Sequence, residues 1–183
     1  HWDLGRQREI DSSLIKVYNP SHESHGWEST HTVVELITDD RAFLVDSIAM
    51  VLNRHNLTIH LTIHPVIRTV RAADGRLHKV LRSGESDDQS IAESFMQFQI
   101  DRQTDDTVLQ QLRAELFEVI HDVARVGNDW KEMRDRLLEA AAALESTKSS
   151  EMVDEITALC QWVAADHFTF LGCIDLKTDT AAK

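Results

Sequence analysis

The sequence predicts an α+β fold in which a mainly antiparallel sheet packs on helices, with additional C-terminal helices. Two observations support this class. Between residues 12 and 101, short β-prone runs are separated by turn signals, whereas residues 104–163 carry apolar residues at helical spacing. Within residues 39–64 the apolar period changes from helical to strictly alternating with no proline or glycine at the junction, so one helix leads directly into one strand of the sheet.

The first two strands are predicted at residues 12–18 and 32–37. The first run, SSLIKVY, ends at the turn signal Asn19-Pro20 and fits an edge strand. The second run, TVVELI, is apolar and β-branched on both faces, which is typical of a central strand. The residues between the two runs are polar and predict a loop.

The helix that follows is predicted to be capped by Asp39 or Asp40, because a carboxylate there accepts unpaired backbone N–H groups. Apolar residues and one histidine then form a single stripe: Leu44, Ile48, Val51, Leu52 and His55. The next strand alternates, with one face formed by Leu57, Ile59, Leu61 and Ile63 and the other by Thr58, His60, Thr62 and His64. Pro65 cannot donate to a neighbouring strand, so we expect an edge or a bulge there.

Two more strands complete the predicted sheet. Asp74-Gly75 is a hairpin signal, so residues 76–81 should return antiparallel to the strand before them. Residues 82–90 have almost nothing to bury and predict a mobile loop. The run ESFMQFQID, residues 93–101, alternates again and predicts a strand whose inward residues are Met96, Phe98 and Ile100.

Three helices and a last strand are predicted beyond residue 103. The first helix covers residues 104–126 and should stop at Gly127. Asp129 and Glu132 form a capping box for the second helix. Ser150 should cap the third, with Ile156 and Leu159 among its inward residues, and the alternating segment from Phe168 to Leu176 predicts a strand.

These elements suggest a division of the chain. We expect an N-terminal strand and loop over residues 1–30, a domain core over 31–126, and a helical extension with the last strand over 127–183.

The composition limits the partners. With 19 basic and 31 acidic residues the formal net charge is -12, which repels nucleic-acid phosphates and anionic membrane surfaces, so we expect neither as a partner. The sequence carries no span of about 20 apolar residues and its first residues do not resemble a signal peptide, which favours the cytoplasm. Cys160 and Cys173 form no Cys-x-x-Cys pair, so we expect buried thiols and no disulfide.

The sequence supports neither a metal site nor a catalytic one. His60 and His64 have the His-x-x-x-His spacing, but on a strand this separates them by about 13 Å, too far for one metal ion. His22 and His25 lie in the polar loop and are expected to be solvated. The six glycines form no G-x-G or P-loop spacing, and no G-x-S-x-G motif occurs, so we expect no catalytic residue.

The segment DDRAFLVDSIAMVLNRHNLTI resembles the signature of ACT domains, which are βαββαβ modules of ferredoxin-like topology that sense amino acids and dimerise. The residues at matching positions are Asp40, Arg41, Leu44, Ile48, Leu52 and Ile59. In order along the chain, VYNPSHESHGWESTHTVVELITDDRAFLVDSI, LNRHNLTIHLTIHPVI, ESFMQFQID and DHFTFLGCIDL together resemble the N-terminal end of the large NAD-specific glutamate dehydrogenases of bacteria.

This resemblance implies an ACT-like fold within a fragment of a very long cytoplasmic enzyme. The fragment would lack the catalytic domain and would hold no cofactor, whereas the parent enzyme would use NAD. Its partners would be other domains and subunits of the same enzyme, with self-association through a sheet edge or helices, and an amino acid would be its effector.

The resemblance also implies where that effector would bind. Backbone N–H groups near Asp40, Arg41 and Ala42 would face its carboxylate, Asp40 would hold its ammonium group, and Asn56 would contact it. The alternatives are that Asp40 is an N-cap, that Arg41 is simply exposed, and that Asn56 is the left-handed residue ending the helix. Phe43 departs from the pattern, since it stands where ACT domains usually carry the glycine that admits the ligand.

Three functions follow as hypotheses. The first is a regulatory or assembly domain of a glutamate dehydrogenase. The second is a purely structural oligomerisation module without a small-molecule ligand. The third is a metal-binding protein that uses His22, His25 and His31.

Overall fold

The computed structural model describes residues 2–146, 150–174 and 176, and the chain divides into two compact units, His1–Val123 and Ala124–Lys183. In the first unit the helices are α1 (Trp2–Gly5), α2 (His22–His25) and α3 (Leu44–Arg54), and the strands are β1 (Leu14–Tyr18), β2 (Thr32–Asp39), β3 (Ile59–Ile63), β4 (Val66–Arg71), β5 (Leu77–Val80) and β6 (Ile91–Ile100). Helix α4 (Asp106–Glu145) begins in the first unit and continues into the second, which also holds α5 (Glu151–Trp162) and the π-helical turn η1 (Val163–His167).

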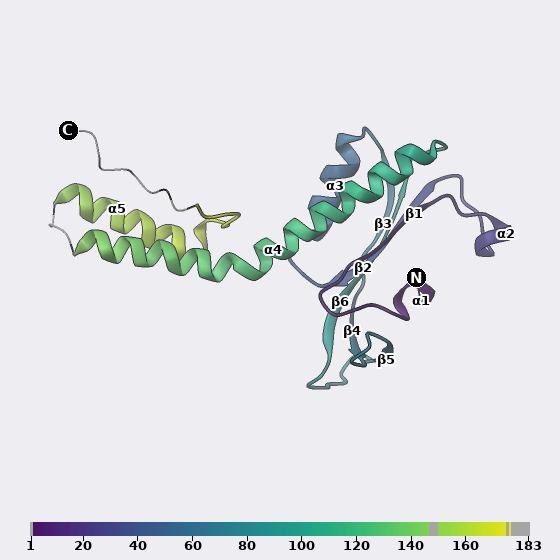
Figure 1. Cartoon of the computed structure of the whole chain (residues 1–183), viewed down its shortest axis with the longest axis horizontal. Helices are drawn as coiled ribbons and strands as arrows, with labels where there is room; N and C mark the ends of the chain where they lie inside the picture. Colours follow the sequence, from purple (N-terminus) through teal and green to yellow (C-terminus); the bar gives the residue numbers. More distant parts are fainter. Residues whose placement is uncertain (1, 147–149, 175, 177–183) are drawn as a thin grey trace. The chain divides into compact units, whose positions relative to one another are not determined.

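The six strands form one antiparallel sheet in the order β1-β2-β6-β4-β5, with β3 also paired to β6 (Figure 1). The three inner strands β2, β6 and β4 have antiparallel neighbours on both sides, and β4 and β5 form the predicted hairpin. The predicted fold class, an antiparallel α+β sheet packed on helices, is therefore confirmed. The edge position beside β2 is filled by β1, which precedes β2 in the sequence.

The strands β3 and β4 lie one after the other along β6. The strand β3 pairs with the end of β6 that contains Phe98 and Ile100, and β4 pairs with the end that contains Ile91. Between them, the Pro65 carbonyl accepts the Phe95 N–H at 3.0 Å, so the proline interrupts the strand without leaving β6 unpaired. The bulge lies between Ile59 and Leu61 and not at Pro65, whereas the alternative of an edge agrees with the structure, since among the described strands β3 pairs only with β6.

This bulge corrects the predicted alternation. Leu57 is buried, whereas Leu61 and Ile63 are exposed, so the four apolar residues do not share one buried face. The reason is the register shift after Ile59, since one extra residue moves every later side chain to the opposite face.

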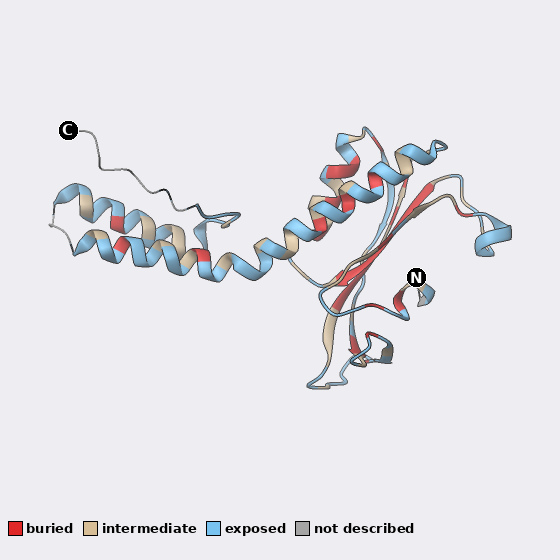
Figure 2. Cartoon of the chain, in the orientation of Figure 1, coloured by how far each residue is buried: buried red, intermediate tan, exposed pale blue. Residues whose placement is uncertain are grey.

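The main core lies between the sheet and two helices, α3 and the first half of α4 (Figure 2). The predicted stripe of α3 is confirmed, because Leu44, Ile48, Val51 and Leu52 are all buried. The inward residues of β6 are confirmed as well, and they meet Leu112, Leu116 and Ile120 of α4. His55 ends the α3 stripe half-buried, with its Nε2 3.0 Å from the Glu115 carboxylate.

Three predictions about helices and strands are wrong. Helix α4 runs through Gly127 without a break, because one glycine costs a long helix only about 1 kcal/mol. The predicted loop before β2 contains the short helix α2, which is capped by the Ser21 side chain. The segment from Phe168 to Leu176 has no strand in its described residues, since nothing there pairs with it; residue 175 lies outside the described residues.

Helix α5 begins as predicted, with the Ser150 hydroxyl accepting the Val153 N–H at 3.3 Å. Its predicted inward face is wrong, because Ile156 and Leu159 are exposed while Thr157 is buried. Cys160 is half-buried and Cys173 exposed, and both are free thiols, so the expectation that both are buried holds only in part.

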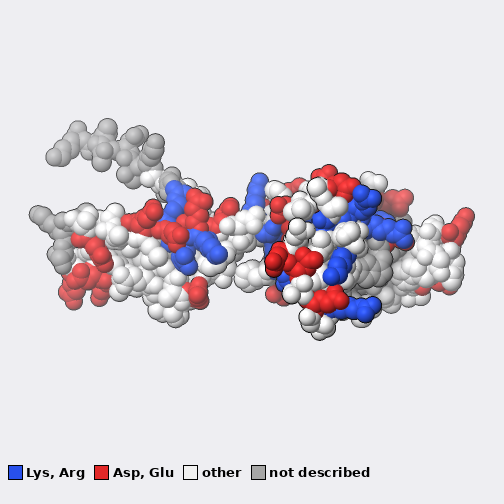
Figure 3. Space-filling model, turned by 90° about the horizontal axis from the view of Figure 1, so that it is seen from below, with Lys and Arg blue, Asp and Glu red and all other residues white. Residues whose placement is uncertain are grey.

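The charged surface agrees with the composition. On the face shown in Figure 3, acidic side chains are interspersed with lysines and arginines. In the part of the chain that the structure describes, no helix combines the length and apolarity needed to cross a bilayer.

Candidate functional site

The candidate site is the loop 40–43, which connects the end of β2 to the start of α3. The residue that precedes α3 is Phe43, whose backbone is left-handed with φ at 68°, and no side chain caps the helix. The prediction that Asp39 or Asp40 caps the helix is therefore wrong. The reason is that both carboxylates are already engaged, Asp39 with Arg8 at 2.6 Å and Asp40 with the Ser94 hydroxyl at 2.6 Å.

Asp40 is held by a chain of hydrogen bonds that leads back into the sheet. The Asp40 N–H donates to the Ala92 carbonyl at 2.9 Å, and its carboxylate accepts from the buried Ser94. Because the Ser94 hydroxyl donates to Asp40, its oxygen accepts from His64 Nε2, which lies 2.9 Å away. His64 thus supports the loop through Ser94.

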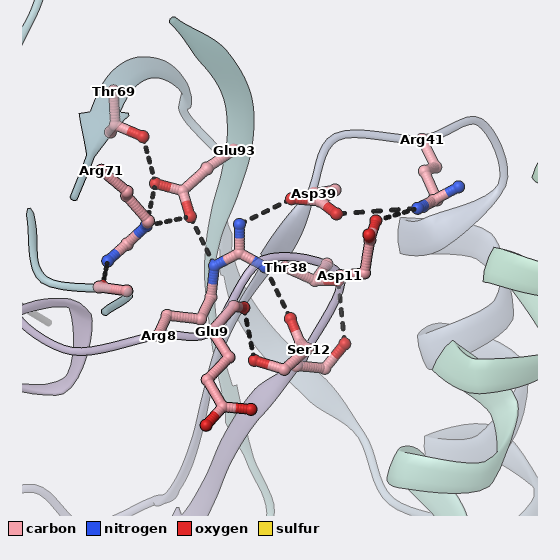
Figure 4. Close-up of polar contacts among 12 residues, drawn as sticks. Arg8, Glu9, Asp11, Ser12, Thr38, Asp39, Arg41, Thr69, Arg71 and Glu93 are labelled. Atoms are coloured by element: carbon pink, nitrogen blue, oxygen red, sulfur yellow. Dashed lines mark hydrogen bonds and ion pairs between the residues drawn. The ribbon is translucent and has the colours of Figure 1, made fainter. Parts of the chain in front are cut away.

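Arg41 lies against the first residues of the chain. Its guanidinium is 3.6 Å from the carboxylates of both Asp11 and Asp39, and only 17% of its side chain is exposed (Figure 4). The alternative reading of Arg41 as simply exposed is wrong, because two carboxylates hold the side chain against the domain. Asp40, Ala42 and Phe43 are the exposed residues of the loop, and 52% of Phe43 is accessible to solvent.

Asn56 is not brought together with the loop. It lies beyond the opposite end of the 11-residue α3, which spans about 16 Å at 1.5 Å per residue. Its φ is 55°, its N–H donates to the Asn53 carbonyl, and the Leu57 N–H donates to the Leu52 carbonyl at 3.1 Å. These bonds are those of a left-handed residue that ends a helix.

A buried network of charges holds the residue that precedes the loop (Figure 4). The sequence did not predict this network. Arg8 and Glu93 have fully buried side chains, Arg71 is 1% exposed, and Glu93 forms ion pairs with both arginines. Glu93 also accepts from the Thr69 hydroxyl. Arg8 reaches on to Asp39, so the network connects β4 and β6 to the residue before the loop.

No local pattern in the sequence marks this network. Arg8 lies in a polar segment and forms its contacts with residues 31 and 85 positions away. A charged residue within an alternating strand, as at Glu93, is the only signal, because such residues are buried only when they are paired.

The histidines of the first unit form separate contacts. His60 Nε2 lies 2.7 Å from Asp101, and the His31 ring is 4.3 Å from the His60 ring. The Thr58 N–H and then His60 bond to Asp101 and lower its pKa to about 2. His25 of α2 stacks on Tyr18 at 4.6 Å, and His22 pairs with Glu28 at 3.9 Å. Among the described residues, no three His, Cys, Asp or Glu side chains are placed to hold a metal ion.

Tyr18, the only tyrosine in the chain, lies at the end of β1. Burial raises the pKa of its hydroxyl well above 10, and the Glu35 carboxylate beside it raises the pKa further. Glu35 itself is buried on β2.

Together, the antiparallel sheet, the helices on one of its faces and the left-handed turn before α3 define an α+β domain of the ACT type. The chain belongs to the family described as "Glutamate dehydrogenase, ACT1 domain", whose sequence model matches residues 1–116.

Among its relatives, three that match almost the whole chain are described below. The NAD-specific glutamate dehydrogenases of Pseudomonas aeruginosa and Halomonas elongata are 35% and 33% identical to it over 93% of the chain. The NAD-specific glutamate dehydrogenase of Mycobacterium tuberculosis is 23% identical over 94%. The chain spans 11% of the length of each of these relatives.

Proposed function

We propose that this chain is the N-terminal regulatory or assembly domain of a large NAD-dependent glutamate dehydrogenase. The observation that carries the proposal is the ACT1 family match over residues 1–116, together with the relatives' similarity over most of the chain. The parent enzyme would convert L-glutamate to 2-oxoglutarate and ammonia. The described residues include no glycine-rich turn of the kind that holds a dinucleotide, so we assign NAD binding and catalysis to other parts of that enzyme.

In this proposal, loop 40–43 receives an amino acid. The first turn of α3 has no side-chain cap, so its N–H groups and the positive end of the helix dipole are available to a carboxylate. Asp40 is exposed beside them and supplies a negative charge for the ammonium group. The Phe43 ring is largely turned to solvent and therefore borders the site.

A thermal melt with a panel of amino acids tests this role. An amino acid at 100 times its Kd adds about 2.7 kcal/mol to the free energy of unfolding, which raises Tm by several degrees. Asp40→Asn should abolish the shift, because it removes the partner of the ammonium group while an amide oxygen can still accept from Ser94. Asp74→Asn, at an exposed turn, is the control and should leave the shift unchanged.

The second candidate is a purely structural oligomerisation module, and Phe43 is the observation that favours it. A bulky residue where the family pattern expects glycine narrows the approach to the α3 amides. Phe43→Gly separates the two candidates: if the side chain alone blocks the site, this variant gains an amino-acid-dependent Tm shift that the wild type lacks.

The assembly role has its own measurement. We propose contacts with other domains and subunits of the same enzyme and self-association through a sheet edge or helices. Light scattering at several concentrations should then show a mass that rises with concentration. A constant monomer mass at high concentration would contradict self-association of this part of the enzyme.

A further inference from the structure

The edge strand β1 borders a groove that the preceding sections leave without a role. Among the described strands, β1 pairs only with β2, so its outer edge carries backbone N–H and C=O groups without strand partners. A groove of about 770 Å³ runs along this edge, lined by β1 itself and by α4 residues that include Arg113, Phe117 and Glu118. Tyr18 and His25, stacked at 4.6 Å, line the same groove.

The shape of the groove fits an extended chain. An exposed strand edge binds a partner strand through its backbone, while side-chain pockets on either side provide selectivity. Phe117, 49% exposed, offers such an apolar contact on the α4 side. The length of β1, five residues, sets the length of the segment that can pair with it.

The charges of the groove favour an acidic occupant. Lys16 alternates with the core residues Ile15 and Val17, so its side chain lies on the face away from the helices, whereas Arg113 lies on the α4 side. Both cations are exposed, and neither has an ion-pair partner among the described residues. Among the described residues that line the groove, Glu118 is the only acidic one, in a chain whose net charge is -12.

The same charges disfavour a second copy of β1 as the occupant. Lys16 is the central residue of β1, so a two-fold pairing centred on it would place two lysines opposite each other. Like charges directly opposite in a sheet are destabilising, and lysine on an edge strand is a common protection against self-pairing.

We propose that the β1 groove binds an extended, acidic polypeptide segment from another domain or subunit of the parent enzyme, which adds to the sheet as a strand beside β1. This inference rests on the assembly role proposed above and specifies the partner for one sheet edge. Lys16 and Arg113 bind carboxylates on the two faces of the added strand, and Phe117 packs against its apolar residue.

The test is a fluorescence-anisotropy titration of the 183-residue chain with a labelled peptide, acetyl-Thr-Glu-Glu-Val-Glu-Glu-Thr-amide, which carries carboxylates on both faces. The same peptide with glutamine in place of glutamate should bind about tenfold more weakly. The double variant Lys16→Glu, Arg113→Glu should weaken binding of the glutamate peptide by at least tenfold. Lys79→Glu on the other sheet edge is the matched control and should leave binding unchanged, since Glu85 already pairs with Lys79 at 3.6 Å.

Two N-methylated peptides test the strand addition itself. N–H groups of an extended peptide point alternately to its two edges, so methylating every second one blocks one edge only. Of the peptides methylated at odd and at even positions, only one should still bind. The proposal would be overturned if the two N-methylated peptides bound equally well, or if the glutamate and glutamine peptides bound equally well or not at all. It would also be overturned if the chain formed a dimer through β1 and bound no peptide.

Failure of this inference can be distinguished from failure of the proposed function. The thermal melt with amino acids measures ligand binding at loop 40–43, and light scattering measures self-association. The peptide titration measures binding at β1 alone. A chain that fails the titration can still pass the other two measurements.

Discussion

Replacing Glu93 by glutamine should destabilise the first unit more than any exposed charge change. Glu93 is fully buried and is the carboxylate shared by Arg8 and Arg71. In the variant Glu93→Gln the negative charge is lost and one oxygen becomes an NH₂ group, which faces arginine donors. Two buried guanidinium groups then compete for one remaining carbonyl oxygen.

The structure indicates how large the loss is. Removing one partner of a buried ion pair costs about 3–5 kcal/mol. Arg8 keeps a second carboxylate, because its Nη2 lies 2.6 Å from Asp39. Arg71 keeps only the backbone carbonyls of Gly5 and Gly75, at 3.1 and 2.9 Å. One arginine is thus left without a counter-charge, so we expect a loss of about 3 kcal/mol, a large part of the 5–15 kcal/mol that stabilises a typical domain.

Urea denaturation followed by circular dichroism measures this loss. The control is Asp74→Asn, which removes the exposed partner of Arg76 and should cost much less, because solvent screens an exposed ion pair. If Glu93→Gln costs no more than the control, the buried network does not hold in solution, and the account of how the loop is supported fails.

Three further predictions concern backbone and pH. Gly75→Ala should cost about 1–3 kcal/mol in denaturation because a Cβ there would lie 2.5 Å from a backbone oxygen, whereas Gly84→Ala, equally left-handed but in open space, should cost only about 1 kcal/mol. An absorbance titration should show Tyr18 still protonated above pH 10; because its pKa is raised by folding, its contribution to stability is present below pH 10 and is lost at higher pH, and a titration at pH 10 in the native chain would contradict its burial. The pKa of Asp101 is lowered to about 2, mainly by the Thr58 N–H, so the stability that its carboxylate contributes is present above about pH 4 and is lost as the pH falls toward 2. The variant Asp101→Asn should therefore lose less stability than the wild type between pH 4 and pH 2 in denaturation experiments. The same loss of stability in both chains would refute this assignment.

The strands and the core helix α3 were predictable because their signals are local. Period-two alternation marked β6, and the stripe from Leu44 to Leu52 marked the face of α3 that is buried. The bulge after Ile59 was not predictable in place, because it depends on how the strand matches β6 at both ends. Gly127 failed as a stop signal because a glycine is only a weak penalty in a helix of 40 residues.

The loop between β2 and α3 was predictable as a connection, but its hydrogen-bond partners were not. The loop lies where the ACT resemblance places it, yet Asp39 and Asp40 serve as acceptors for Arg8 and Ser94 instead of capping α3. An N-cap prediction considers only residues within one turn, whereas these partners come from distant parts of the sequence. Arg41 was misjudged for the same reason, since its partner Asp11 precedes it by 30 positions.

The shape of the loop follows from these distant contacts. A left-handed phenylalanine costs roughly 1–2 kcal/mol relative to an ordinary backbone, and Phe43 has no side-chain cap to offset that cost. The residues before it are fixed on both sides, Asp39 by the buried Arg8 and Asp40 by Ser94, so the chain must turn sharply to enter α3. The turn therefore does not require glycine at this position. It requires the charge network beneath it, so Glu93→Gln should loosen the loop, whereas Phe43→Gly should keep its shape and change only the access to the α3 amides.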